Sequence, residues 1–101
     1  MTKKTIAKRR ITRDCFNLDQ AWLKWLSERL PVYLRDARKI VDFSFHKFTH
    51  RGKEYRQDQL VERMIVLVNK AITIGFGEPG YDEVIDELME IWKLVFHAMW
   101  W

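Results

Sequence analysis

Side chains that can bind a metal ion are present in this sequence, but their spacing does not form a zinc-binding motif. The residue types that bind zinc occur at four positions: Cys15, His46, His50 and His97. His46 and His50 are four residues apart, so a helix would place them on one face, where both could reach a metal ion. However, the glutamate of an H-E-x-x-H motif is missing, and Arg51 and Lys53 lie nearby and would repel a divalent ion. We therefore expect no metal site.

The glycine pattern at 75–80 has the form G-x-G-x-x-G, which is typical of dinucleotide-binding loops. Such a loop needs a strand before it, free backbone amides for pyrophosphate, and a second strand with a ribose-binding acid about 20 residues later. Pro79 removes one amide, Glu78 repels phosphate, and only 21 residues follow Gly80. We interpret the pattern as a helix stop followed by a turn, and we expect no nucleotide cofactor.

Nucleophilic catalysis also lacks its usual arrangement of residues. The thiol of Cys15 lies beside Asp14, whose charge disfavours the reactive thiolate. Ser27 and Ser44 have no identifiable base. The carboxylates near the end of the chain lie on the polar face of an amphipathic pattern, where nothing indicates the burial that tunes paired catalytic acids. We expect no catalytic residue, no cofactor and no enzyme activity.

The cations are the most informative side chains. Thirteen of them form three clusters: Lys3, Lys4, Lys8, Arg9, Arg10 and Arg13, then Arg35, Arg38 and Lys39, then Lys47, Arg51, Lys53 and Arg56. His46, His50 and Tyr55 are interleaved with the third cluster. Cations neutralise phosphates and rings stack on bases, so this composition predicts nucleic-acid binding through the backbone. No helix-turn-helix, RNP or zinc-finger pattern indicates base-specific reading. The alternative is that these cations only improve solubility.

The charge is divided unequally between the two halves of the chain. Residues 1–56 hold fifteen Lys and Arg against six acids, whereas residues 57–101 hold three against eight. This asymmetry indicates polyanion binding by the basic half, or pairing of basic and acidic surfaces between copies. Six residues near the C-terminus are the candidate protein interface: Glu83, Asp86, Glu87, Glu90, Trp100 and Trp101. The last two tryptophans could instead fold back onto Trp22 and Trp25.

Helical periodicity organises most of the chain. Apolar residues recur every three or four positions in four segments, which we expect to be helices: 18–30, 32–48, 57–74 and 81–99. Asn17 is the expected cap of the first helix, and Pro31 is expected to separate it from the second. The third segment is apolar over most of its circumference and should be the hub.

One segment allows an alternative. Val41, Phe43 and Phe45 also alternate with period two, as in a strand, and residues 51–53 could be the tip of a hairpin that reaches Tyr55. We favour the helix over 32–48, in which Phe45 and Phe48 belong to the apolar face.

Size and composition limit the possible classes of protein. A chain of 101 residues and 12.3 kDa is long enough for one domain, which we place at residues 14–101 behind a flexible basic arm at residues 1–13. The longest apolar run, residues 64–68, is far too short to cross a membrane. A single cysteine cannot form an internal disulfide, so we expect a cytoplasmic protein. The expected fold is an all-α, compact four-helix bundle.

In size, helicity, basic character and lack of catalytic motifs, the chain resembles the small all-helical subunits of CRISPR effector ribonucleoproteins. The resemblance covers the general character of the whole chain, and no motif assigns a role to any residue. It implies a non-enzymatic subunit that stacks along a complex and steadies nucleic-acid strands. The alternative function is a protein-interaction module of a phage or mobile element, such as an assembly chaperone or an inhibitor, because tail-assembly chaperones of phages are similarly small and helical.

Overall fold

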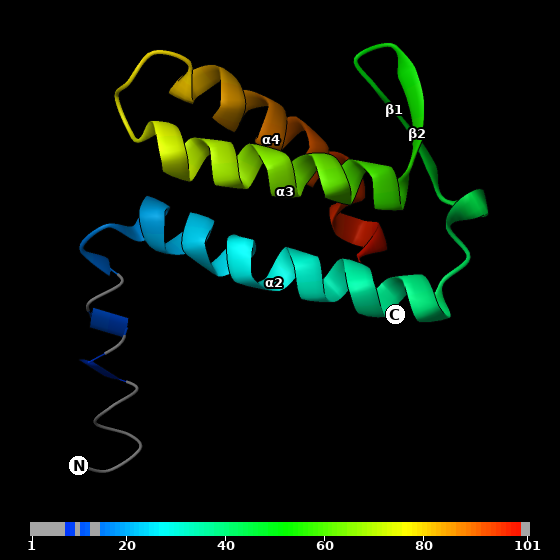
Figure 1. Cartoon of the computed structure of the whole chain (residues 1–101), viewed down its shortest axis with the longest axis horizontal. Coiled ribbons are helices and arrows are strands. Elements are labelled where there is room, and N and C mark those ends of the chain that lie inside the picture. The colour runs from blue at the N-terminus through cyan, green and yellow to red at the C-terminus, as the bar shows by residue number, and fades with distance from the viewer. Residues whose placement is uncertain (1–7, 10, 13–14, 100–101) are drawn as a thin grey trace.

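The structure is a computed structural model, and it describes residues 8–9, 11–12 and 15–99. Within this part the chain is mostly helical, as expected for its all-α class, but it also contains a two-stranded sheet (Figure 1). The elements are α2 (Leu18–Ile40), η1 (Phe43–Phe45), β1 (Lys47–His50), β2 (Lys53–Arg56), α3 (Gln57–Ile74), α4 (Tyr81–Val95) and η2 (Phe96–Ala98). In the described residues, three long helices and a hairpin therefore replace the four expected helices.

The two helices expected on either side of Pro31 are one helix, α2, and the predicted boundary is wrong. Its buried side chains lie on one face from before the proline to after it: Leu23, Leu26, Leu30, Leu34 and Ala37. Proline in a helix interior costs about 3 kcal/mol relative to alanine, whereas each buried leucine contributes about 1.5–3 kcal/mol. Burial on both sides of Pro31 outweighs the local cost. Pro31 itself is exposed.

The start of α2 also differs in detail from the sequence analysis. Asn17 occupies the N-cap position, but its side chain makes no capping hydrogen bond. The nearby Gln20 instead donates a hydrogen bond from Nε2 to the hydroxyl of Tyr81, 3.5 Å away, and so links α2 to the start of α4.

Residues 41–56 contain a hairpin, which the sequence analysis gave as the less favoured alternative to a helix. The expected helix over 32–48 is therefore wrong beyond Ile40. The strands begin at Lys47, later than the alternating pattern indicated, and pair in an antiparallel register with Lys47 opposite Arg56. The turn residues Arg51 and Gly52 have φ values of 50° and 83°. A type I′ turn needs positive φ at both central positions, and glycine adopts this conformation without steric cost.

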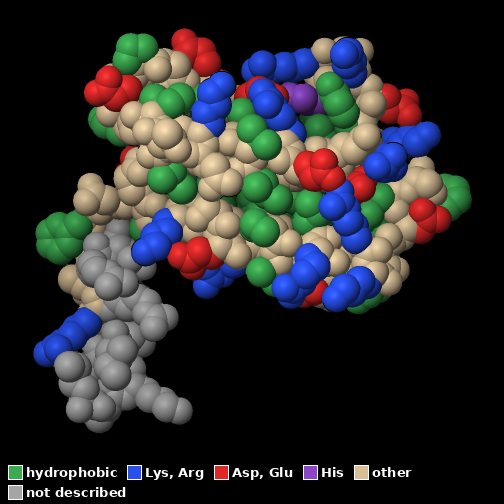
Figure 2. Space-filling view, in the orientation of Figure 1, with side chains coloured by type: hydrophobic (Ala, Val, Ile, Leu, Met, Phe, Trp, Pro, Cys, Tyr) green, Lys and Arg blue, Asp and Glu red, His purple; other side chains and the backbone are tan. Residues whose placement is uncertain are grey.

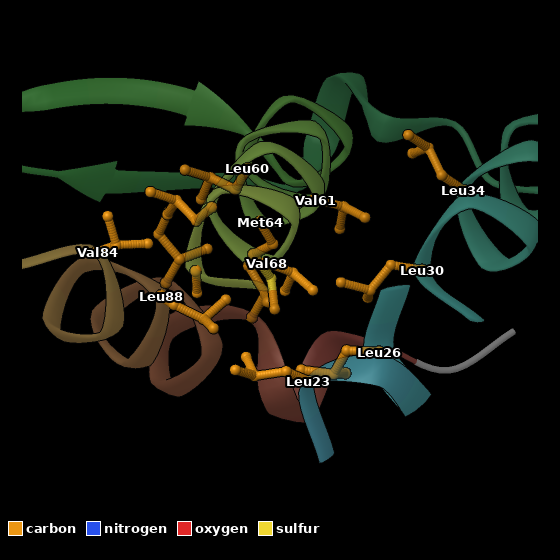
Figure 3. Packing of buried hydrophobic residues seen from close by; sticks show 14 of the residues in the cluster. Leu23, Leu26, Leu30, Leu34, Leu60, Val61, Met64, Val68, Val84 and Leu88 are labelled. Carbon is orange, nitrogen blue, oxygen red and sulfur yellow. The ribbon is translucent and has the colours of Figure 1, made fainter. Parts of the chain in front are cut away.

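The core lies between α3 and the two helices that pack on it. Helix α3 buries Leu60, Val61, Met64, Leu67, Val68 and Ala71, which confirms its expected place as the hub. In Figure 3, leucines of α2 and residues of α4 such as Val84 and Leu88 point toward Met64 and Val68. Trp22 of α2 and Trp92 of α4 meet edge to face, with ring centroids 6.2 Å apart. No helix in the described part is long and apolar enough to span a membrane.

Candidate nucleic-acid interface

Part of the first basic cluster lies in the described residues. Lys8 and Arg9 have helical backbone and exposed side chains. Several predicted site residues lie outside the described part of the chain: Lys3, Lys4, Arg10, Arg13, Trp100 and Trp101. The expected flexibility of the arm and the expected aromatic interface at the C-terminus therefore stay predictions.

The second basic cluster, on α2, is matched by nearby carboxylates. Arg35 donates to Asp36 at 3.0 Å, and the ammonium of Lys39 lies 3.9 Å from the same carboxylate. This hydrogen bond from Arg35 holds the pKa of Asp36 below its usual value. Arg38 pairs with Asp58 at 3.5 Å and also with Glu62, both on α3. The acids reduce the positive potential that this face presents to a phosphate.

The third basic cluster, on the hairpin, is also paired at most positions. Arg56 donates to Asp58 at 3.0 Å, and the Lys47 ammonium lies 3.5 Å from Glu54 on the opposite strand. Burial by itself would raise the pKa of Asp58, but hydrogen bonds from Arg56 and Arg38 hold it below its usual value. Among the described residues, Lys53 has no ion pair. Figure 2 shows the same mixture, with blue cations beside red acids on the visible face.

The acidic helix α4 is the partner of the hairpin tip. Arg51 donates from Nη2 to Glu90 at 2.7 Å, and its Nη1 lies 3.8 Å from Glu87. The complementary charges of the two halves therefore meet within one copy, which reduces what α4 can offer to another protein. Glu83 and Asp86 stay exposed.

Glu87 is buried and contacts three basic side chains, of which His50 is buried and Arg51 and Arg63 are exposed, and its expected place on the solvent face is wrong. Arg63 of α3 donates two hydrogen bonds to the Glu87 carboxylate, at 2.8 and 3.0 Å, and Nε2 of His50 lies 3.1 Å from it. The hydrogen bonds from Arg63 outweigh the effect of burial and lower the pKa of Glu87 from 4.5 to about 2. His50 is only 7% exposed, so its ring is not available for stacking.

Arg63 was not identified from the sequence, because its position in the chain shows only that it belongs to the polar strip of α3. Glu87 lies 24 positions further along, and no local spacing connects the two residues. Tyr55, a second ring expected to stack, is half-buried beside His50, with ring centroids 6.3 Å apart. Phe45, expected on the core face of a helix, is 86% exposed.

Most of the positive charge within residues 15–99 is thus balanced by nearby acids, whereas the amino-acid sequence of the arm contains no acid. Residues 1–13 contain six Lys and Arg and no acid, whereas residues 14–101 contain twelve Lys and Arg and fourteen acids. The arm therefore carries +6 and the remainder −2, which together give the net charge of +4.

No group of three or more His, Cys, Asp or Glu residues that could hold a metal ion occurs among residues 8–9, 11–12 and 15–99. Comparison of the chain with models of known protein families, with curated proteins and with solved structures gave no match.

Proposed function

We propose that the protein binds nucleic acid through the phosphate backbone, with little sequence preference and without catalysis, as a small subunit of a larger nucleoprotein assembly. One observation carries the proposal: the arm is strongly basic, while residues 14–101 have a small negative net charge and pair most of their cations with acids. This function is also what the resemblance to the small subunits of CRISPR effectors implies.

The arm supplies most of the affinity in this proposal. A cation that meets a phosphate releases condensed counterions, and this release favours binding. Arg38 or Arg56 must first give up carboxylate partners to meet a phosphate, which offsets part of the gain. Lys8 and Arg9 are exposed and have no ion pair among the described residues. The helical domain then positions the arm beside the other subunits.

The test measures affinity for fluorescent single-stranded and duplex oligonucleotides across a salt series. Replacing the six cations of residues 1–13 by serine should weaken binding to all sequences and flatten the slope of log affinity against log salt, by about 0.7–0.9 for each phosphate that is no longer neutralised. The matched control removes three exposed domain cations, Lys24→Ser, Lys70→Ser and Lys93→Ser, and should change the slope much less.

Deleting residues 1–13 should weaken binding in the same way while the melting temperature stays nearly unchanged, because Ile11, one of the few apolar residues removed, is 64% exposed. The proposal is wrong if the arm variant binds as tightly as the wild type, or if the wild type has no salt-dependent affinity for nucleic acid.

A second candidate function is self-association, which one feature of α2 favours. Leu18, Trp25 and Val32 follow one another at intervals of seven on this helix and are 64%, 49% and 46% exposed. Intervals of seven align side chains into the stripe that a second helix covers in a coiled coil. All three side chains are exposed among the described residues, and Trp25 also borders a cavity that Leu26, Leu30 and Trp92 line.

The charges beside the stripe fit a second copy of the chain. Glu28 and Arg29 are neighbours, with Arg29 Nη1 3.6 Å from Glu28 Oε2, and both are exposed. In an antiparallel pair of α2 helices, Glu28 of each copy can face Arg29 of the other. The Arg29 guanidinium lies 4.6 Å from the centre of the Trp25 ring, so cation and ring occupy the same surface.

A further inference from the structure

Phe45 has the highest exposed fraction of the large hydrophobic side chains in the described part, at 86%. An isolated exposed apolar residue is common on protein surfaces and needs no explanation by itself. Phe45 differs from such residues in two ways, which are the rigidity of its turn and the charge around it.

The turn that carries Phe45 is held from both sides. The Asp42 carboxylate accepts hydrogen bonds from the Ser44 amide at 3.0 Å and from the Ser44 hydroxyl at 2.7 Å. Phe43 is buried and its carbonyl accepts from the His46 amide at 3.0 Å. The His46 carbonyl in turn accepts from the amide of Gln57, the first residue of α3, at 2.8 Å. The backbone that carries Phe45 is thus held in place, so binding a ligand there does not require the turn to become ordered.

The segment around Phe45 is rich in cations. Residues 39–53 contain one acid, Asp42, whose carboxylate accepts the two hydrogen bonds from Ser44, against four cations: Lys39, Lys47, Arg51 and Lys53. On the other side of the turn, Lys39 lies in the last turn of α2 with a side chain that is 71% exposed. A phosphate that follows a base stacked on Phe45 therefore meets more cations than acids in the neighbouring segments of the chain.

Another exposed ring provides a direct comparison. Phe76 is 76% exposed, but Glu78, Asp82 and Glu83 follow it closely in the chain. Its ring also meets Tyr81 edge to face, with centroids 5.8 Å apart. The acids around Phe76 would repel a phosphate, so exposure alone does not make it a base-stacking residue.

A cavity of about 330 Å³ lies beside the Phe45 turn. Its lining includes the rings of Tyr33, Phe43, His46 and His97. Gln57 is also in the lining and is 1% exposed, and its side-chain amide donates to the Tyr33 hydroxyl at 3.1 Å and to the Ala98 carbonyl at 3.0 Å. The cavity has room for a neighbouring base with its ring against aromatic side chains.

We propose that the nucleic acid is single-stranded and that one of its unpaired bases stacks on Phe45, while Lys39 and Lys47 leave their surface ion pairs with Asp36 and Glu54 to face the adjoining phosphates. A duplex hides the faces of its bases in its own stack, whereas a single strand offers them to aromatic side chains. This inference rests on the proposed function and adds the substrate class.

The test compares four proteins: wild type, Phe45→Ala, Phe45→Trp and Phe76→Ala. Affinities are measured for a single-stranded oligonucleotide and for its duplex over a salt series. We expect the wild type to prefer the single strand, and Phe45→Ala to bind it on the order of tenfold more weakly. The salt slope should stay unchanged because no charge is removed. Phe45→Trp should retain the affinity, and Phe76→Ala should match the wild type.

The outcomes separate this inference from the proposed function. A wild type that binds both forms equally, with Phe45→Ala unaffected, overturns the stacking site and leaves backbone binding by the arm intact. An equal loss in Phe76→Ala, or an equal loss for the duplex, overturns it as well. A wild type that binds neither form overturns the proposed function itself. Circular dichroism of each variant verifies that the helical fold is retained.

Discussion

At the residue scale, Glu87 shows how buried charges can be tolerated in a small domain. Removing a carboxylate from water is costly unless hydrogen bonds and opposite charges replace its hydration. Here Arg63 supplies two hydrogen bonds, His50 lies within 3.1 Å and Arg51 adds a second guanidinium. These groups come from α3, β1 and the hairpin turn, so a single carboxylate on α4 holds three segments together.

Glu87→Gln should therefore destabilise the fold in a manner that depends on pH. The pKa of Glu87 falls from 4.5 to about 2 on folding, so its stabilising effect is complete above pH 4.5 and is lost as the pH falls toward 2. We expect the variant to lose about 2–3 kcal/mol of unfolding free energy at pH 7 and to approach the wild type near pH 2. Urea denaturation over this pH range measures the difference.

Glu83→Gln, one turn earlier on the same helix and exposed, is the matched control and should change stability by less than about 0.5 kcal/mol. A Glu87→Gln effect that is the same at pH 7 and near pH 2 would contradict the argument, because it would show that the charge of Glu87 is not involved.

At the element scale, α2 contains a local cost that its packing offsets. Pro31 has no amide hydrogen to donate, and its ring crowds the preceding turn of the helix. Because Pro31 is exposed and contributes nothing to the buried face, Pro31→Ala should remove this cost without opening a cavity. We expect the unfolding free energy to rise by about 1–3 kcal/mol.

Chemical denaturation followed by circular dichroism measures this gain. Lys24→Ala, at another exposed position of α2, is the control and should change stability little, since lysine and alanine are both good helix formers. A less stable Pro31→Ala variant would refute the prediction and would show that the packing of α2 on α3 requires the backbone geometry that Pro31 imposes.

The hairpin is the element that connects the basic half of the chain to the acidic half. Its two strands are short, and a hairpin of this length is not stable alone. Contacts of Arg51 and His50 with α4, and of Arg56 with the start of α3, attach it to the helices. The same contacts place the acid-free segment 43–53 next to the helical core.

At the scale of the whole molecule, the basic residues of the first half of the chain fall into two groups, those of α2 and the hairpin, most of which pair with acids, and those of the arm. The acidic α4 pairs with the basic hairpin inside the fold, whereas the arm has no acid of its own within residues 1–13. Because exposed ion pairs contribute little energy, an interface between copies needs a buried apolar centre rather than further charge pairs. Among the described residues, the exposed stripe of Leu18, Trp25 and Val32 on α2 can supply such an apolar centre.

Trp25→Glu should therefore dissociate the proposed pair of α2 helices, because the substitution would place two carboxylates in an apolar contact. Val66→Glu is the matched control, since Val66 is 53% exposed on α3 and lies outside the stripe. Sedimentation velocity over a concentration series measures the oligomeric state of all three proteins. A wild type that stays monomeric at high concentration, or a control that dissociates to the same extent, would exclude α2 as the interface.

The sequence by itself determined the helical class and the positions of most helical residues. A helix that buries one face needs an apolar residue every three or four positions, and this repeat is visible in the sequence. The apolar residues of 57–74 indicated the hub correctly, and the glycines after it marked its end. The unequal charge of the two halves was also visible without any structure.

Only the tertiary structure decided which local preference prevails where two conflict, and which charges meet. Burial on both sides of Pro31 keeps α2 continuous, and contacts with α3 and α4 favour a hairpin over 47–56 that periodicity alone did not distinguish from a helix. The pairing of Glu87 with His50, 37 positions earlier, depends on the packing of separate elements. No local pattern encodes such a pairing, because the free energy that forms it comes from the assembled core.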